Sequence, residues 1–351
     1  MNGSEATQLT QNKLLTGGDS LMAYETEDQE TQYCFPDINS SCVKERRSSH
    51  GYIIIYLFVS LLSAWTVFLN LLVIISISHF KKLHTPTNMI ILSLAVTDLF
   101  IGLVMPVEAI RLIDKCWYFG DTFCGLYMLF VSLLVTVSLG NLVLIAVDRY
   151  VAVCHLLLYP QRITITKTLV SICLNWVCFS AYCTALIINN SFFDTQTDVC
   201  YGQCLVMVSF SWIATDLFIS FIFPCLLINS LYLRIFYVVH QQVKVINSLM
   251  KGGKCVTEGS VKRKSESKAA LTLGIIVSVF LLCYIPYYIC SLTVNSSTAL
   301  NVLVWVLYAN SGLNPLVYAL FYSWFKKTAK LIITLKILHP ASSLINFVSQ
   351  H

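Results

Sequence analysis

Seven apolar stretches dominate this chain of 351 residues and limit the folds that it can adopt. They run near 52–77, 89–107, 123–147, 169–188, 205–228, 269–290 and 300–321. Each has about the twenty residues that an α-helix needs to cross the hydrocarbon core of a bilayer. Hydrophobic residues make up 56% of the chain and charged residues only 12%, which leaves little material for a soluble domain. The sequence therefore predicts an all-α membrane protein, a seven-transmembrane helix bundle.

The remaining segments divide the chain into three parts. A polar N-terminal tail, 1–50, precedes the bundle at 51–325, and a short tail, 326–351, follows it. The first fifty residues lack a basic start before an apolar core, so we expect the first helix to direct insertion. The stretch near 241–267 predicts a flexible inner loop without a phosphate-binding glycine motif. After the seventh helix, Trp324, Phe325, Lys326 and Lys327 predict a short amphipathic helix on the membrane surface.

The distribution of basic residues predicts the orientation in the membrane. If the N-terminus is extracellular, 17 Lys and Arg residues lie on the cytoplasmic side and 6 lie elsewhere, as the positive-inside rule requires. The same orientation puts every Asn-X-Ser glycosylation motif outside, at Asn2, Asn39, Asn189 and Asn295. We therefore expect a multi-pass protein of the plasma membrane with a cytoplasmic C-terminal tail. The net charge of +5 then indicates contact with anionic inner-leaflet lipids rather than with nucleic acid.

Ionisable residues inside apolar stretches are costly and usually mark a functional site. Asp98 lies at an apparent depth similar to that of Asn70, Ser138, Asn310 and Asn314. Carboxylate, hydroxyl and amide oxygens are hard ligands that suit a hydrated sodium ion, and Asp98, Ser138, Asn310 and Asn314 form the candidate set. A buried hydrogen-bond network without metal explains the same residues equally well. We expect no other cofactor.

Two further motifs lie toward the cytoplasmic ends of the third and seventh stretches. Asp148 and Arg149 are adjacent, and a buried pair of this kind can open when a partner enters. A basic residue at a helix end also has the simpler role of setting topology. In the seventh stretch, Pro315 interrupts the hydrogen-bond ladder of the helix, and Tyr318 lies about one turn further on, where it can swing.

Several motifs together resemble those of the rhodopsin-like G-protein-coupled receptors. They occur in the family's order over all seven stretches: Asn70, LAVTD ending at Asp98, Trp176, DRY at 148–150, Pro224, CYIP at 283–286 and NPLVY at 314–318. Within that family, NSGLNPLVYALFYSWF at 310–325 is similar to the fingerprint of trace amine-associated receptors. HFKKLHTPTN at 79–88 and CWYFG at 116–120 resemble the same subfamily.

That resemblance implies partners and a signalling mechanism. Such receptors bind a small molecule and signal through a heterotrimeric G protein, here of the stimulatory, olfactory type that raises cyclic AMP. Cilia of olfactory sensory neurons are the implied location. The residues that match the family's activation and coupling positions are Asp148, Arg149, Tyr150, Tyr232, Pro286, Asn314, Pro315 and Tyr318. Tyr284 stands where the family usually has a tryptophan, which is a departure in the activation region.

The resemblance also implies two extracellular disulfide bonds. The first joins the outer end of the third helix to the second outer loop, which maps to Cys124 and Cys204. The second ties the N-terminal tail to that loop and maps to Cys42 and Cys200, with Cys34 as a competitor for the same partner. Either bond would hold a lid over the mouth of a ligand cavity.

The acidic residue that would bind an amine has an unusual position. Amine receptors of this family have an aspartate eighteen residues before the Arg of DRY, and that position here is Val131. Asp216 lies about two helical turns outside Pro224, a depth that suits a ligand cavity. A buried carboxylate without a basic neighbour either pairs with a ligand ammonium or is protonated. Some fish trace amine-associated receptors are similar in having the acid on the fifth helix without the acid on the third.

Other side chains complete the expected ligand site. Aromatic faces attract cations, and the candidates are Tyr284, Tyr287, Tyr288, Trp305 and Tyr308, although each also suits ordinary aromatic packing. Glu108 either holds a second ammonium of a diamine or pairs with Arg111 on the same helix. We expect a receptor for volatile or water-borne amines. The alternative is a receptor for a non-amine ligand, with Asp216 protonated or internally hydrogen-bonded.

Other classes of membrane protein fit the sequence less well. A photoreceptor opsin needs a lysine on the seventh helix for its retinal, and Tyr308 occupies that position. A transporter or membrane enzyme would be indicated by an inverted repeat, a charged midplane pathway or a metal-binding motif. The sequence contains none of these, so we do not expect an enzyme.

Overall fold

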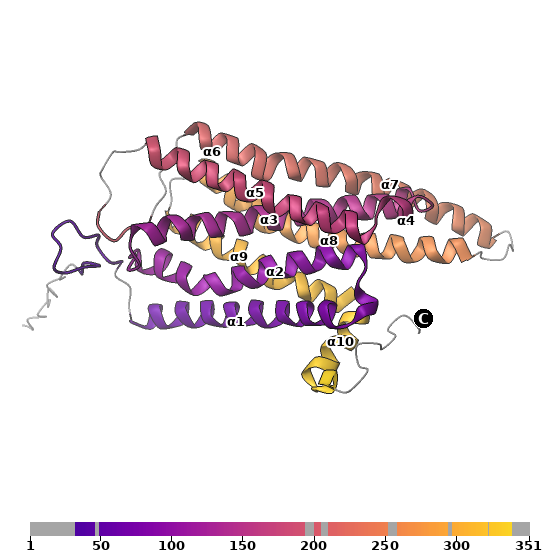
Figure 1. Ribbon diagram of the computed structural model, residues 1–351, viewed down its shortest axis with the longest axis horizontal. Coiled ribbons are helices and arrows are strands. Elements are labelled where there is room, and N and C mark those ends of the chain that lie inside the picture. The colour runs from indigo at the N-terminus through magenta and orange to yellow at the C-terminus, as the bar shows by residue number, and fades with distance from the viewer. Residues whose placement is uncertain are drawn as a thin grey trace, which may run out of the picture. The chain divides into compact units, whose positions relative to one another are not determined.

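The computed structural model of the chain describes residues 32–45, 49–193, 200–204, 210–251, 258–293, 297–321 and 323–338. Long helices run side by side through the bundle (Figure 1). They are α1 (Ser49–His79), α2 (Pro86–Ala109), α3 (Asp121–Cys154), α5 (Ile165–Phe193), α6 (Phe210–Leu217), α7 (Phe223–Lys251), α8 (Glu258–Thr293) and α9 (Ser297–Phe321). The π-helical turn η3 (Phe218–Ile222) joins α6 to α7, so these form one span.

The described helices match the seven expected membrane spans. Six of them have the length and apolar composition to cross a bilayer, and Val277–Thr293 of α8 is a shorter apolar segment. The order of the helices along the chain follows the seven apolar stretches. The predicted fold class, an all-α seven-transmembrane bundle, is thus confirmed.

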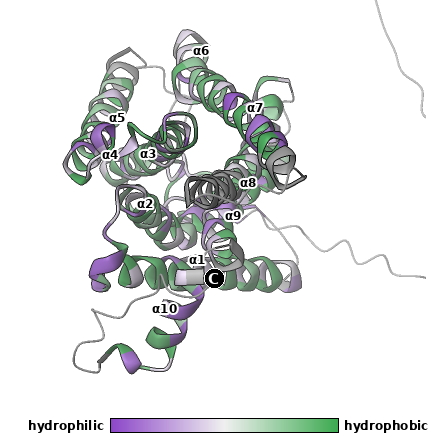
Figure 2. Ribbon diagram, turned by 90° about the vertical axis from the view of Figure 1, so that its right-hand side faces the viewer, coloured by the Kyte–Doolittle hydropathy of each residue, from purple (hydrophilic) through white to green (hydrophobic). Residues whose placement is uncertain are grey.

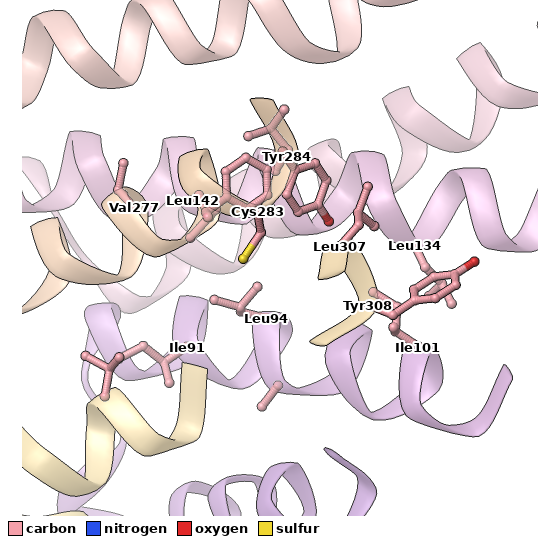
Figure 3. Close-up of a cluster of buried hydrophobic side chains, with 14 of the residues drawn as sticks. Ile91, Leu94, Ile101, Leu134, Leu142, Val277, Cys283, Tyr284, Leu307 and Tyr308 are labelled. Atoms are coloured by element: carbon pink, nitrogen blue, oxygen red, sulfur yellow. The ribbon is translucent and has the colours of Figure 1, made fainter. Parts of the chain in front are cut away.

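The interior of the bundle lies between α2, α3, α8 and α9. Figure 3 shows part of this core, with Leu94 on α2, Leu142 on α3 and Tyr284 on α8 gathered around one region. α3 contacts α2, α5, α7 and α8, and α2 contacts α1, α3, α5 and α9. Figure 2 shows the bundle from one end. The outer faces are apolar, as shown by the exposed Leu57, Leu174 and Leu233. Such surfaces suit lipid, because large contiguous apolar areas are rare on soluble proteins.

The inner loop expected near 241–267 is shorter than the sequence analysis predicted. α7 continues to Lys251 and α8 begins at Glu258, so both helices extend beyond the apolar stretches. Hydropathy marks where a helix leaves the membrane, whereas a polar helix in water depends on residues such as Lys, Gln and Glu, which are good helix formers. The end of an apolar stretch is therefore not the end of its helix.

A short helix follows the bundle, as expected from the amphipathic pattern after the seventh span. α10 (Ser323–Ile333) buries Phe325 and Thr328 and exposes Lys326 and Lys327. Trp324 packs against Phe80 and Leu83 at the inner end of α1. Such a helix, apolar on one face and basic on the other, has the pattern of helices that lie on a membrane surface.

Three disulfide bonds hold the segments at the opposite end of the bundle. Two of them, Cys42–Cys200 and Cys124–Cys204, are the pairings that the family resemblance implied. The third joins Cys34 to Cys116, so Cys34 does not compete for Cys200. Backbone hydrogen bonds from Trp117 to Gly202 (2.7 Å) and from Cys42 to Tyr201 (3.0 Å) complete this layer. The segment 32–45 is thereby tied to Cys116, in the loop before α3, and to the segment 200–204.

Candidate ligand-binding site

A cavity of about 410 Å³ lies among the bundle helices and faces the disulfide-bonded end. Six of the eight ligand-site residues predicted from the sequence line it: Glu108, Val131, Asp216, Tyr287, Tyr288 and Tyr308. Most of the other lining side chains are apolar or small, including Met128, Val135, Leu217, Val304 and Leu307. A largely apolar cavity with a few polar groups is the usual form of a small-molecule site.

Asp216 on α6 lines the cavity and forms the first of its two polar parts. Its Oδ1 accepts hydrogen bonds from the hydroxyls of Tyr182 (3.0 Å) and Ser220 (2.8 Å). Neither an ion pair of Asp216 nor a hydrogen bond to its Oδ2 occurs among the described residues. Ser220 belongs to the π-helical turn that precedes Pro224, whose missing N–H loosens the helix here. The carboxylate thus keeps one oxygen available to a ligand.

Glu108 on α2 lies in a second polar part of the cavity and is already paired. Arg111 donates to it from Nε (3.0 Å) and from Nη2 (2.5 Å), and the Tyr127 hydroxyl donates at 2.7 Å. The sequence left open whether Glu108 holds a second ligand ammonium or pairs with Arg111, and the structure has the pair with Arg111. Arg111 itself lines the cavity, although its sequence position indicated only a partner for Glu108. The three-residue spacing from Glu108 was the available signal.

The aromatic residues divide into those that line the cavity and those that support it. Tyr288 stacks on Phe221 with ring centroids 4.1 Å apart, and Tyr287 meets Tyr288 edge to face. Tyr284 does not line the cavity. It lies one turn before Tyr288 on α8, and its ring stacks on that of Phe280 with centroids 3.9 Å apart. Figure 3 shows Tyr284 within the apolar core. Trp305 does not line the cavity either.

Trp305 packs against the ring of Tyr308, at 5.9 Å between centroids. Spacing along the sequence showed that these residues share a helix region. It did not show the rotation of each helix about its axis, which decides which side chains reach the cavity.

Deeper in the bundle, the proposed sodium ligands are all buried. Asn314 donates to Asp98 Oδ2 at 2.8 Å, and Asn70 donates to the Ser311 carbonyl at 3.0 Å. Asp98 Oδ1 and Asn310 Oδ1 have no hydrogen-bond partner among the described residues. Buried acceptors of this kind are normally satisfied by water or a cation. The residues therefore fit a hydrated monovalent cation.

At the end of the bundle away from the disulfide bonds, Asp148 on α3 collects four hydrogen bonds. Arg149 donates twice, from Nε (2.9 Å) and Nη2 (2.6 Å), the Thr87 hydroxyl donates at 2.8 Å, and the Tyr159 hydroxyl donates at 2.9 Å. Tyr159 lies on the short helix α4 (Tyr159–Arg162), and no sequence motif pointed to it. Burial and the Asp148 charge raise the pKa of Tyr159 to about 12.

The remaining activation residues lie nearby or along the same helices. Tyr150 meets His155 edge to face at 5.7 Å between ring centroids. Tyr232 on α7 packs beside Gly274 of α8, so it lies at the contact between these helices. Pro286 is inside α8, Pro315 is inside α9, and Tyr318 is buried.

Of the predicted glycosylation sites, the structure describes the side chain of one. Asn39 is exposed in the disulfide-bonded segment. Asn189 belongs to the last turns of α5, although its side chain is outside what the structure describes. Asn2 and Asn295 lie outside the described residues.

The sequence is similar to known proteins over most of its length. Residues 69–318 match the family described as "7 transmembrane receptor (rhodopsin family)". The chain is 41% identical to Trace amine-associated receptor 13c of Danio rerio over 330 residues, covering 90% of this chain and 96% of that protein. It is 37% identical to Trace amine-associated receptor 6 of Rattus norvegicus, over 91% and 96% of the two chains. Trace amine-associated receptor 6 of Homo sapiens is 36% identical over the same shares.

Proposed function

Because this chain belongs to the rhodopsin family of seven-transmembrane receptors, and within it to the trace amine-associated receptors, we propose that it senses amines through Asp216. The protein is a multi-pass membrane receptor and not an enzyme. In the proposed complex, the ligand ammonium binds the Asp216 carboxylate inside the cavity, and the apolar part of the ligand lies against Val131 and the tyrosines.

The observation that carries this proposal is the charge balance of the cavity. The charged side chains among its described lining residues are Asp216, Glu108 and Arg111. Glu108 and Arg111 neutralise each other at hydrogen-bond distance. Asp216 is half-buried and has no cationic partner among the described residues, and drawing a carboxylate partly out of water without a counterion is unfavourable. A ligand with an ammonium group supplies the missing charge.

One observation favours the alternative of a non-amine ligand. Tyr182 and Ser220 already donate to Asp216, and such bonds also stabilise an internally satisfied acid. Both donors contact Oδ1, however, and no hydrogen bond to Oδ2 occurs among the described residues. This asymmetry supports a ligand partner over a closed internal network.

Signalling through a stimulatory G protein and cyclic AMP is the proposed output, in cilia of olfactory neurons. Arg149, held by Asp148 and Thr87, is the group that a G protein would engage once the inner ends of α3 and α8 separate. Asp98, Ser138, Asn310 and Asn314 would hold a sodium ion that acts as an allosteric modulator. The basic residues of α10 would contact lipid.

The extracellular position of the N-terminus can be tested at Asn39, which is exposed. Asn39→Gln should remove one glycan and increase the gel mobility of the surface protein. Ser40→Ala is the matched control, because it changes only the middle residue of the motif and keeps the acceptor asparagine. Glycosidase treatment should remove the difference between the two variants. Equal mobility of both variants before that treatment would contradict a glycan at Asn39.

The decisive experiment removes the Asp216 charge. Asp216→Asn should raise the amine concentration needed for a cyclic AMP response by about thirtyfold or more, because removing one partner of a hydrogen-bonded charge pair enclosed with the ligand costs about 2–5 kcal/mol. Tyr182→Phe is the matched control, since it removes a hydrogen bond to the same carboxylate but keeps the charge.

Neutral isosteres of each amine should be inactive, and surface expression is measured for both variants. Val131→Asp should add or redirect an ammonium site, because it places an acid on α3 at the lining of the same cavity. An Asp216→Asn variant that responds normally to amines would refute the role of Asp216, and responses to neutral ligands would favour the alternative.

A further inference from the structure

The second polar part of the cavity bears on which amines the receptor accepts. Glu108 receives hydrogen bonds from Arg111 on both carboxylate oxygens and from Tyr127 on one of them. Tyr308 also lies against Glu108. The Glu108 side chain is 3% exposed, against 17% for Arg111. The acid is therefore enclosed by its own partners.

Arg111 presents the accessible group in this region. Its Nε and Nη2 are used by Glu108, whereas no hydrogen bond of Nη1 occurs among the described residues. A guanidinium nitrogen can only donate. Arg111, Glu108, Asp216 and Tyr287 line the same cavity, so one ligand in it can contact both polar parts.

From this geometry we infer that Arg111 restricts the receptor to ligands with a single ammonium and selects a neutral hydrogen-bond acceptor, such as an ether or carbonyl oxygen, at the opposite end. This inference rests on the proposed pairing of the ammonium with Asp216. Two carboxylates and one guanidinium leave one net negative charge, which a monoamine balances. The second ammonium of a diamine would meet Arg111, and an ω-amino acid would leave the negative charge unbalanced.

Three primary amines with the same number of non-hydrogen atoms test the inference. Hexylamine ends in a methyl group, 4-methoxybutylamine has an ether oxygen near its end, and 1,5-diaminopentane ends in a second ammonium. The readout is the ligand-induced shift in Tm of the purified receptor, titrated to half effect, because it needs no G protein.

In the wild-type receptor, the diamine should require about a hundredfold more ligand than hexylamine, because a like charge at a desolvated contact costs several kcal/mol. The ether should bind about tenfold more tightly than hexylamine, because it accepts a hydrogen bond from a charged donor. Equal affinity of the diamine and hexylamine would overturn the inference.

Arg111→Met removes the guanidinium and keeps an unbranched side chain. Glu108 then becomes available, so the diamine should bind more tightly than hexylamine, and the advantage of the ether should disappear. If this variant does not fold because Glu108 has lost its partner, Glu108→Gln with Arg111→Met removes both charges. The diamine penalty should then fall by about tenfold or more. If the diamine still binds more weakly than hexylamine by the wild-type factor in either variant, desolvation of the diamine causes the difference, and the role of Arg111 is refuted.

The outcomes separate this inference from the proposed function. If hexylamine and the diamine both shift Tm with the same half-effect concentration, amine sensing stands and only the selection by Arg111 is refuted. No shift with any of the three amines, in a folded receptor, refutes amine sensing itself and the inference with it.

Discussion

Tyr159 gives the sharpest test of the proposal that the intact Asp148–Arg149 pair keeps the receptor in a closed state, in which a G protein does not engage Arg149. Its hydroxyl donates to Asp148 Oδ1 at 2.9 Å, while Arg149 and Thr87 donate to Oδ2 of the same carboxylate. Because Asp148 in turn holds Arg149, every donor to Asp148 keeps the carboxylate in place. Tyr159→Phe removes one of these donors and leaves the ring and its packing unchanged.

The magnitude follows from the type of hydrogen bond. A bond to a charged acceptor contributes about 1.5–3 kcal/mol, and the lower value applies here because Tyr159 is only half-buried. A loss of about 1.5 kcal/mol from the closed state shifts the equilibrium toward the open state by about tenfold. Since water or Arg149 can replace part of the lost bond, a tenfold rise in ligand-independent activity is the upper expectation.

The assay is basal nucleotide exchange on a G protein by the purified receptor in lipid nanodiscs, at equal receptor concentration. Tyr201→Phe is a matched control, because Tyr201 is exposed on the outer loop and its ring contact with Phe35 does not need a hydroxyl. Basal exchange by Tyr159→Phe that equals wild type would refute the view that Tyr159 stabilises the closed pair.

Three other changes test separate features. Burial and the Asp148 charge raise the pKa of Tyr159 to about 12, so the stabilisation of the closed state by its hydroxyl should be complete below pH 10 and lost as the pH rises through 12. Basal exchange should therefore not change between neutral and mildly alkaline pH because of Tyr159. A change over that range in the wild type that Tyr159→Phe lacks would contradict this. Gly140→Ala should lower stability by about 1–3 kcal/mol, because the added Cβ would lie 1.9 Å from Asn175 Oδ1 on α5. Gly125→Ala on the same helix meets nothing within 4 Å and should leave Tm unchanged or higher. Replacing Cys34 and Cys116 together by Ser should lower stability by about 2–4 kcal/mol, whereas Cys173→Ser, at an exposed free cysteine, should have no effect on Tm.

The membrane fold could be read from the sequence because its signal is local. Each span is a continuous apolar stretch whose length matches the bilayer, and Asp98, Arg149 and Pro315 stand out because polar or helix-breaking residues are costly in that setting. The position of Asp216 eight residues before Pro224 predicted its depth from the α-helical rise, and the π-helical turn η3 between them is a departure from that rise. Asp216 is one of the residues that line the cavity.

Contacts between distant segments were decided only by the tertiary structure. Arg111 faces the cavity, Tyr284 lies below it, and Tyr159 reaches Asp148, and each of these depends on how a helix is rotated against its neighbours. The Cys34–Cys116 bond likewise depends on where the N-terminal segment folds back. Sequence alone determined which segments enter the membrane, because burial in lipid is a property of each segment. Which side chains meet inside the bundle is a property of the packed helices together, and only their tertiary arrangement could decide it.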